Sequence, residues 1–385
     1  AFLPFYRNHT LFQPVAFDQL FWTAGFYFLI RFIRSKNKMD MLSAGLMLGL
    51  GLQNKYTMFI WAFGIAISLG FYNRGELFRN KWLYLSGLLA LIVFLPNLIW
   101  QFLHDFPILK HAQALSEHQL SQNGYGEFVL DQIIFPATFI TSLMGLWWLL
   151  KRGDYRWVAV SVLVIFFTML LTKSKSYYVF SIYPVLFAAG GVQLEVWLDK
   201  VKSFWTYPVA ASIFLPFIPW IPELTPVLPI DRFVNYQGIE EYNGRIELTS
   251  DYADMFGWVE QVALVDSVYQ SLSTDEKLNC VIWAENYGEA GALKILGKKY
   301  GLPDPVSRHG SCWLWGPGNS NAKVWISIGN EEPSVEHVFG DVELVKIIHH
   351  KYAIDEENHI PVYICREPKV NIETWWSDYA DHVFD

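Results

Sequence analysis

The sequence predicts a polytopic α-helical membrane protein with a soluble α/β domain at its C-terminus. Three observations support this fold class. Hydrophobic residues make up 52% of the 385 residues and charged residues only 17%, whereas soluble proteins carry about 25%. Long uncharged apolar runs recur through residues 1–222. The formal charge is +7 over residues 1–222 (17 basic, 10 acidic) and −15 over residues 223–385 (12 basic, 27 acidic), which indicates two domains in different surroundings.

Eight apolar runs have the character of membrane-spanning helices, because a bilayer core requires about 20 apolar residues in helical form. Six runs are clear, and the first two are weaker but lie at the same spacing. None shows the alternating pattern of a membrane barrel strand. The predicted spans are 17–33, 39–54, 57–73, 82–103, 132–150, 157–172, 176–194 and 203–222.

The basic residues predict the orientation of these spans. If the first span runs inward, 12 of the 17 basic residues in this half lie in inner turns, as the positive-inside rule requires. The domain 223–385 then lies outside, in a periplasmic or equivalent compartment of a protein of the inner (cytoplasmic) membrane. The inner turns are 31–40, 74–81 (with Arg74), 151–156 and 199–202 (with Lys202).

The outer segment 104–125 has an apolar pattern typical of an interfacial helix, and a plain connecting loop is the alternative. After a Pro-rich link, residues 223–385 show the periodicity of a soluble domain, in which Asn286 is expected to cap a helix and Gly301 to stop it. The order of elements indicates helices packed on a sheet. The expected helices are 254–273, 286–299 and 333–339, and the expected strands are 278–284, 322–328, 341–349 and 360–366.

Several function classes lose support from the composition. The acidic C-terminal domain would repel phosphate, so no nucleic-acid partner is expected. No glycine-rich phosphate loop is present in the sequence. Cys280, Cys312 and Cys365 lack metal-site spacing, so no metal site is assigned, and they read as small buried residues or as one disulfide with one free thiol. The chain begins Ala-Phe-Leu-Pro without Met, and we expect its natural N-terminus to lie upstream.

Basic residues at the outer ends of the spans are the strongest functional signal. Lys173 and Lys175 stand beside Tyr177 and Tyr178, and Lys55 is followed by Tyr56. Cations with nearby hydroxyls at a bilayer interface are suited to hold a lipid phosphate. The alternative is that these side chains only reach toward water from helix ends.

A second set of residues consists of candidate substrate contacts. Asp18, near an outer helix start, also fits an N-cap-like role. His104 and Asp105, at the outer end of a span, could bind hydroxyls or lie in a solvated loop. The group from Glu285 to Glu289, where a strand leads into a helix, occupies the usual ligand position of α/β sheets. Trp313 and Trp315 could stack a sugar or cover a core. These candidates are Asp18, His104, Asp105, Glu285, Asn286, Tyr287, Glu289, Trp313 and Trp315.

Several runs together resemble bacterial glycosyltransferases related to dolichyl-phosphate-mannose protein mannosyltransferases (glycosyltransferase family 39, GT-C superfamily). No single run is decisive, and their order along residues 15–328 is more specific than any one of them. The runs are Gly49–Thr57, Pro96–Gln101, Lys175–Tyr178 with Tyr183–Pro184, Asn286–Leu293, Tyr300–Pro303 and Trp313–Pro317.

The resemblance implies a GT-C-like enzyme that transfers a sugar from a polyprenyl-phosphate donor to a glycan, lipid or protein acceptor outside the membrane. It implies an acidic general base in the first outer loop, which is expected upstream of Ala1, and cationic groups that stabilise the leaving phosphate. Asp18 does not match the motif of that base. The resemblance implies no obligatory cofactor and an optional divalent cation. The donor-site residues implied are Lys55, Tyr56, Lys173, Lys175, Tyr177 and Tyr178.

Two other functions compete with this one. A non-catalytic scaffold or glycolipid-binding protein would explain the missing general-base loop. A transporter would need charges inside the spans, for which Asp131 at a span end is the nearest candidate, and an inverted repeat, which is not obvious in the sequence.

Overall fold

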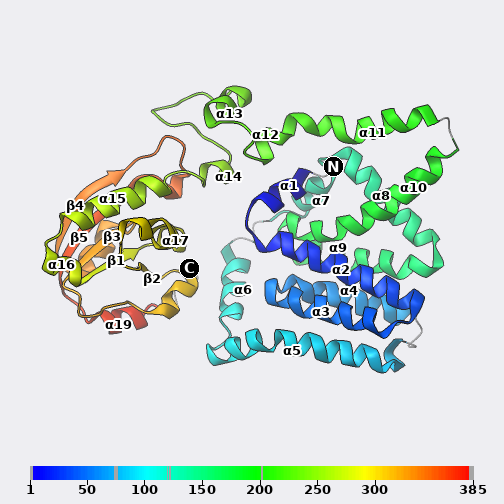
Figure 1. Cartoon of the computed structure of the whole chain (residues 1–385), viewed down its shortest axis with the longest axis horizontal. Coiled ribbons are helices and arrows are strands. Elements are labelled where there is room, and N and C mark those ends of the chain that lie inside the picture. The colour runs from blue at the N-terminus through cyan, green and yellow to red at the C-terminus, as the bar shows by residue number, and fades with distance from the viewer. Residues whose placement is uncertain (1–2, 73–76, 119, 121–122, 201–202, 381–385) are drawn as a thin grey trace. The chain divides into compact units, whose positions relative to one another are not determined.

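The computed structural model divides the chain into two compact units, residues 1–227 and 228–385 (Figure 1). It describes residues 3–72, 77–118, 120, 123–200 and 203–380. The division lies five residues after the position that the sequence predicts. Arg74 and Lys202, assigned above to inner turns, lie outside the described residues. Each unit is described by itself.

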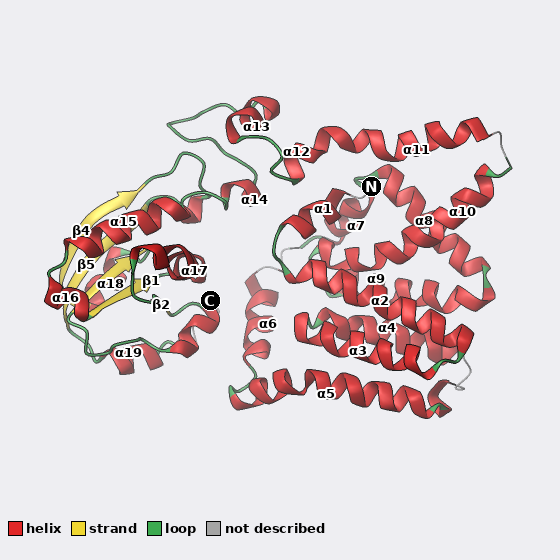
Figure 2. Ribbon diagram, viewed as in Figure 1, coloured by secondary structure: helices red, strands yellow, loops and turns green. Residues whose placement is uncertain are grey.

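All regular secondary structure among the described residues of the N-terminal unit is helical, and loops connect the helices (Figure 2). Its helices begin at residues suited to the purpose: Asn37 and Asn80 cap α3 and α5 by accepting hydrogen bonds from backbone N–H groups, and Pro14 and Pro136 open α2 and α8. The helices are α1 (Leu3–Thr10), α2 (Pro14–Ser35), α3 (Lys38–Asn54), α4 (Thr57–Tyr72), α5 (Lys81–Leu103), α6 (Pro107–His118), α7 (Tyr125–Ile133), α8 (Pro136–Lys151), α9 (Arg156–Leu171), α10 (Tyr183–Leu198), α11 (Thr206–Phe214) and α12 (Ile221–Leu224). Short 3₁₀ segments connect them: η1 (Leu77–Arg79), η3 (Gly153–Tyr155), η4 (Ser176–Ile182), η5 (Ser203–Trp205) and η6 (Leu215–Trp220).

Helical segments occupy all eight predicted ranges, but fewer could cross a bilayer. Four described segments are long and apolar enough, or five if α7 and α8, which are bent by 94°, form one broken span. The sequence predicted eight. The α2 helix carries Asp18, Arg31 and Arg34, and α3 has only 17 residues. The four segments are Lys81–Leu103, Gly153–Leu171, Ser176–Leu198 and Thr206–Leu224.

Helices α8 and α10 lie side by side with their backbones almost touching. A Cβ atom added to Gly190 would lie 2.2 Å from the Thr141 carbonyl oxygen, and one added to Gly145 would lie 2.0 Å from the Leu186 carbonyl oxygen. Small residues permit this approach, which drives helix association in a membrane through close packing. The two glycines therefore set the distance between these helices.

The variant Gly190→Ala should destabilise the N-terminal unit by about 1–3 kcal/mol, because its Cβ would force α8 and α10 apart. Gly191→Ala is the matched control, since nothing lies within 4 Å of a Cβ added there. Thermal unfolding of the purified chain in detergent measures the difference. Equal melting temperatures for the two variants would contradict this packing.

The C-terminal unit contains a five-stranded sheet in the order β2-β1-β3-β5-β4. Strand β1 is parallel to both β2 and β3, whereas β5 is antiparallel to β3 and β4. The strands are β1 (Cys280–Ala284), β2 (Val306–Ser307), β3 (Val324–Ile328), β4 (Phe339–Ile348) and β5 (Ile360–Pro368). The helices are α13 (Ile230–Gln237), α14 (Ser250–Ala253), α15 (Trp258–Ser271), α16 (Thr274–Leu278), α17 (Tyr287–Leu296), α18 (Glu332–Val338) and α19 (Ile372–Ser377), with η7 (Gly297–Tyr300), η8 (Gly310–Trp315) and η9 (Asp355–Glu357).

Apolar clusters cover both faces of this sheet. Every residue of β1 and β3 is buried, as expected for strands packed on two sides. Ile282 packs with Val265 of α15 and Leu293 of α17 in one cluster. Trp283 belongs to a second cluster with Val335 of α18. The α/β domain predicted from the sequence is therefore present.

Most predicted elements of this unit are found with shifted ends. Asn286 caps α17 by accepting a hydrogen bond from the Glu289 N–H (2.9 Å), and Gly301 ends η7 at a φ of 73°, as predicted. The sequence did not predict β2, because two residues are too few to show an alternating pattern. The segment 104–125 contains a helix, α6, over Pro107–His118.

The three cysteines form no disulfide. Cys280 and Cys365 are buried, and burial raises the pKa of each thiol to about 12. Cys312 in η8 is only half-buried, and burial also raises the pKa of its thiol. The expectation of small buried side chains is therefore met by two of the three.

Candidate functional site

Lys55 lies in the break between α3 and α4 at one end of these helices. Its backbone is extended (φ −156°, ψ 133°), which ends α3 and lets α4 begin at Thr57. The ammonium nitrogen lies 3.4 Å from the ring centroid of Tyr178 and 5.5 Å from that of Tyr177. The two rings meet edge to face at 4.8 Å and so form an aromatic corner around the charge.

Asp18 is buried in α2, with only 1% of its surface exposed. Its Oδ2 accepts hydrogen bonds from Thr57 Oγ1 (2.9 Å) and Ser181 Oγ (3.5 Å). Its Oδ1 is buried and accepts no hydrogen bond from the described residues. The buried indole of Trp22 also interacts favourably with this carboxylate. The charges of Asp18 and Lys55 attract each other. A buried carboxylate oxygen without a donor is energetically costly, so a hydrogen bond to this atom would stabilise it.

The N-cap-like role suggested for Asp18 is wrong. Helix α2 begins four residues earlier at Pro14, and its N-cap is Gln13. Proline is favoured in the first helical turn, since its missing N–H would have no partner there. Asp18 therefore lies inside the helix. It forms a cluster with Lys55, Tyr177 and Tyr178, here called the Asp18–Lys55 cluster.

The two lysines predicted to act together lie in different surroundings. The charge of Lys175 repels that of Lys55, and Lys175 lines a polar pocket of about 270 Å³ with Tyr177. Lys173 instead places its ammonium nitrogen 5.5 Å from the ring centroid of Tyr125, and its carbonyl oxygen accepts a hydrogen bond from Asn123 Nδ2 (3.0 Å). The polar pocket that Lys175 and Tyr177 line is completed by Asn123, Gly124, Glu127, Phe128, Asp131, Ser174 and Ser176.

Tyr56 supports the cluster from the side of α5. Its hydroxyl donates to Asn97 Oδ1 (2.6 Å) and accepts from Gln101 Nε2 (3.2 Å), while Gln101 Oε1 accepts from the Ile108 N–H at the start of α6 (3.2 Å). These bonds hold the residue next to Lys55 in place. Tyr56 therefore has the contacts of a positioning residue, and its role as a donor contact stays a prediction.

Two predicted residues are not joined to this cluster by any described contact. The ring of His104 stacks on Trp100 with centroids 4.5 Å apart, and its Nδ1 lies 2.8 Å from the Trp100 carbonyl oxygen. Asp105 follows with a φ of 58° in the turn before α6. Both residues therefore shape the end of α5.

The predicted residues of the C-terminal unit also fall into two groups, one at a hollow and one apart from it. Glu285, Asn286 and Tyr287 line one hollow at the end of β1, and Glu289 lies buried beside them. Burial first, and then the charges of Glu357 and Glu285, raise the pKa of Glu289 well above its usual value.

The two tryptophans of η8 lie apart from that hollow. Trp313 exchanges two hydrogen bonds with Trp376 of α19, from Trp313 Nε1 to the Trp376 carbonyl oxygen (2.8 Å) and in return (2.9 Å), which favours its role as a core contact. Trp315 is 70% exposed, with the Lys294 ammonium nitrogen 5.0 Å from its ring centroid.

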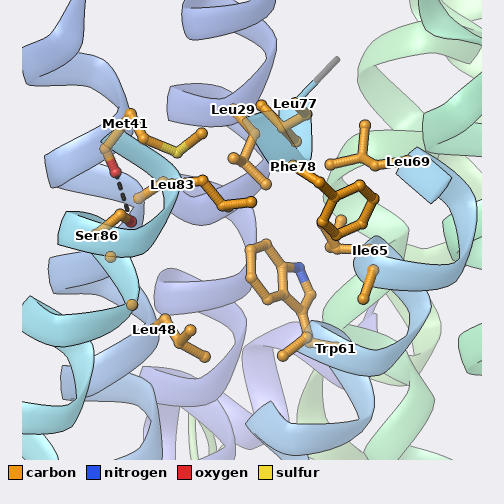
Figure 3. Close-up of a pocket in the computed structure, with 15 residues that line it drawn as sticks. Leu29, Met41, Leu48, Trp61, Ile65, Leu69, Leu77, Phe78, Leu83 and Ser86 are labelled. Atoms are coloured by element: carbon orange, nitrogen blue, oxygen red, sulfur yellow. Dashed lines mark hydrogen bonds between the residues drawn. The ribbon is translucent and has the colours of Figure 1, made fainter. Parts of the chain in front are cut away.

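A separate apolar cavity of about 160 Å³ lies among α2, α3, α4, α5 and η1 (Figure 3). Leu29, Met41, Trp61 and Phe78 point into it, and the hydroxyl of Ser86 already donates to the Met41 carbonyl oxygen (2.9 Å). The cavity offers almost no polar contact and contains none of the predicted residues. It is therefore not the candidate site.

Sequence reasoning missed several residues of the Asp18–Lys55 cluster and its support. Thr57 ends the run Gly49–Thr57, which contains Lys55. Asn97 and Gln101 stand in the run Pro96–Gln101, so both runs offered a signal. Ser181 had none, because a lone serine in an apolar segment is typical of a helix packing position.

Residues 1–100 match the family model described as dolichyl-phosphate-mannose-protein mannosyltransferase. The resemblance inferred from the sequence is confirmed for this part of the chain, which includes both Asp18 and Lys55. The match supports a membrane glycosyltransferase in general terms. Comparisons with curated proteins and with solved structures find no match.

Proposed function

From the match over residues 1–100, we propose that the chain is a glycosyltransferase that moves a sugar from a polyprenyl-phosphate donor to an acceptor hydroxyl on the extracytoplasmic face of the inner membrane. One observation carries this proposal. The buried carboxylate of Asp18, whose Oδ1 accepts no hydrogen bond from the described residues, lies in one cluster with the ammonium group of Lys55. Such a pair can hold a ligand that presents a hydroxyl group and an anion together.

The cationic side of the site suits a lipid phosphate. Lys55 and Lys175 repel each other in the free protein. An anion bound between them would relieve this repulsion, and its attraction to both charges is strong where water is excluded. The aromatic corner of Tyr177 and Tyr178 keeps the Lys55 ammonium group in place without neutralising it.

These charges would also promote the reaction. As the bond between the anomeric carbon and the phosphate oxygen breaks, the electron pair passes to the phosphate, which leaves as polyprenyl phosphate. The acceptor oxygen forms the new bond to the anomeric carbon and loses its proton to a base. Cations placed at the leaving phosphate stabilise the transition state more than the ground state. Asp18 Oδ1 would accept a hydrogen bond from a sugar hydroxyl and orient the ring.

The matched variants Lys175→Ala and Lys173→Ala test the proposal. Lys175→Ala should lower both transfer and donor affinity by about tenfold or more, because the positive charge that attracts the donor phosphate is removed. Lys173→Ala should change them less than about fivefold, since its side chain lies on Tyr125. The measurements are transfer of radiolabelled sugar from polyprenyl phosphate by the full-length protein and binding of the donor in detergent. Wild-type transfer and donor binding in Lys175→Ala would overturn the proposal.

A further inference from the structure

The C-terminal unit contains a hollow of about 840 Å³ that the proposed transfer does not use. Its position is typical of a binding site. Strand β1 leads to β2 at one edge of the sheet, whereas its other neighbour, β3, leads to β4 at the opposite edge. A topological switch point therefore lies between the ends of β1 and β3, and Glu285 follows β1 there. Ligands of open α/β sheets bind at the carboxyl ends of strands at such points. The lining residues are Ser250, Asp251, Asp254, Trp258, Glu285, Asn286, Tyr287, Gly288, His309, Ile354, Glu356, Glu357 and Tyr379.

A fixed polar network supports the hollow. Glu357, only 5% exposed, accepts hydrogen bonds from Gln261 Nε2 (2.8 Å) and Asn286 Nδ2 (3.1 Å). Asn286 Oδ1 accepts in turn from the Glu289 N–H (2.9 Å). Gln261 Oε1 and Glu289 Oε1 are buried and make no hydrogen bond with the described residues. The network thus has more acceptors than donors.

The charged residues that line the hollow are all acidic. Five of the lining residues are carboxylates, and none of the described lining residues is lysine or arginine. Burial, followed by neighbouring carboxylates, raises the pKa values of Asp254, Glu285 and Glu357. Like charges held this close favour a cationic ligand and repel an anionic one.

Aromatic rings complete the wall. Tyr287 is 65% exposed, and its ring meets that of His309 edge to face at 4.9 Å. Trp258 is held by a hydrogen bond from Nε1 to the Asp254 carbonyl oxygen (2.6 Å) and by close packing on Gly288. Rings of this kind stack on the apolar face of a sugar and attract an ammonium group through their π electrons.

We propose that this hollow binds an amino sugar, in which protonated amines pair with Asp254 and Glu285 and a sugar ring stacks on Trp258 or Tyr287. A bare metal ion is a poorer fit, because no group of three or more His, Cys, Asp or Glu residues among the described residues could hold one. The volume lies within the range of small-ligand sites, which is about 300–1,000 Å³. The proposal is independent of the transfer reaction.

Calorimetry with the full chain in detergent at fixed ionic strength tests this site. A tetramer of glucosamine should bind at least about tenfold more tightly than the matched tetramer of N-acetylglucosamine, which lacks the charges. Glu285→Gln and Asp254→Asn should each weaken the glucosamine tetramer about tenfold or more. Glu240→Gln, an exposed acid outside the lining residues, is the control and should bind as the wild type does.

Three outcomes would overturn the proposal. Equal binding of the two tetramers would show that the amines are not recognised. Equal binding of spermidine and the glucosamine tetramer would indicate a site for any polycation. Absence of binding by the glucosamine tetramer to wild-type protein with an unchanged melting temperature would remove the site altogether. Transfer activity enters none of these measurements, so they stand apart from the proposed reaction.

Discussion

The variant Lys55→Met is expected to lose sugar transfer by about 100-fold or more, the usual effect of removing a group that stabilises charge in a transition state. Methionine keeps most of the side-chain length but removes the charge from the corner formed by Tyr177 and Tyr178. The donor phosphate would then lose one cation, and Asp18 would lose its nearby counter-charge. Both donor affinity and turnover should therefore fall.

Transfer assays and donor binding in detergent measure this effect. Lys151→Met, at the exposed last turn of α8, is the matched control and should retain wild-type activity. Thermal unfolding of both variants separates loss of function from loss of fold. If Lys55→Met retains transfer while the control is also active, Lys55 does not contact the donor.

The variant Asp18→Asn is expected to lower transfer by a similar factor of about 100 for a different reason. The amide could still accept a hydrogen bond from Thr57, so the local structure is kept. The negative charge would be lost, and an NH₂ group in the position of Oδ1 would be unable to accept a hydrogen bond from a sugar hydroxyl. The sugar, rather than the phosphate, should therefore be misplaced.

Two ligands distinguish these roles. Polyprenyl phosphate without sugar should bind Asp18→Asn as tightly as the wild type, whereas the sugar-bearing donor should bind more weakly. Lys55→Met should weaken both. Asp154→Asn, an acid exposed in η3, serves as the control. Equal loss of both ligands in Asp18→Asn would show that Asp18 acts only through Lys55.

The sequence predicted the cationic side of the site better than its acidic side. Lys55 and Tyr178 are 123 positions apart, yet the positive-inside rule placed both at the same membrane face, and the structure brings them into contact. Asp18 was harder to interpret, because an acid near a helix start is usually explained by the helix itself. Its partners Thr57 and Ser181 come from separate segments, and only the packing of α2 against both α4 and η4 unites them.

The fold shows the same division. Long apolar runs predicted helices reliably, but not how many could span, since α2 and α3 carry polar residues or are short. In the C-terminal unit, helix capping at Asn286 was readable from local sequence. The hollow beside it was not, because Trp258 and Glu357 come from segments almost 100 residues apart.

The unequal burial of the three cysteines has a practical consequence for membrane sidedness. A membrane-impermeant maleimide reacts with thiolates that it can reach. Cys280 and Cys365 would therefore not react in the folded protein, because both are buried and burial raises the pKa of each thiol. Of the three cysteines, Cys312 alone is a partly exposed residue. Residues 1–385 therefore contain one reporter of the compartment that contains the α/β domain.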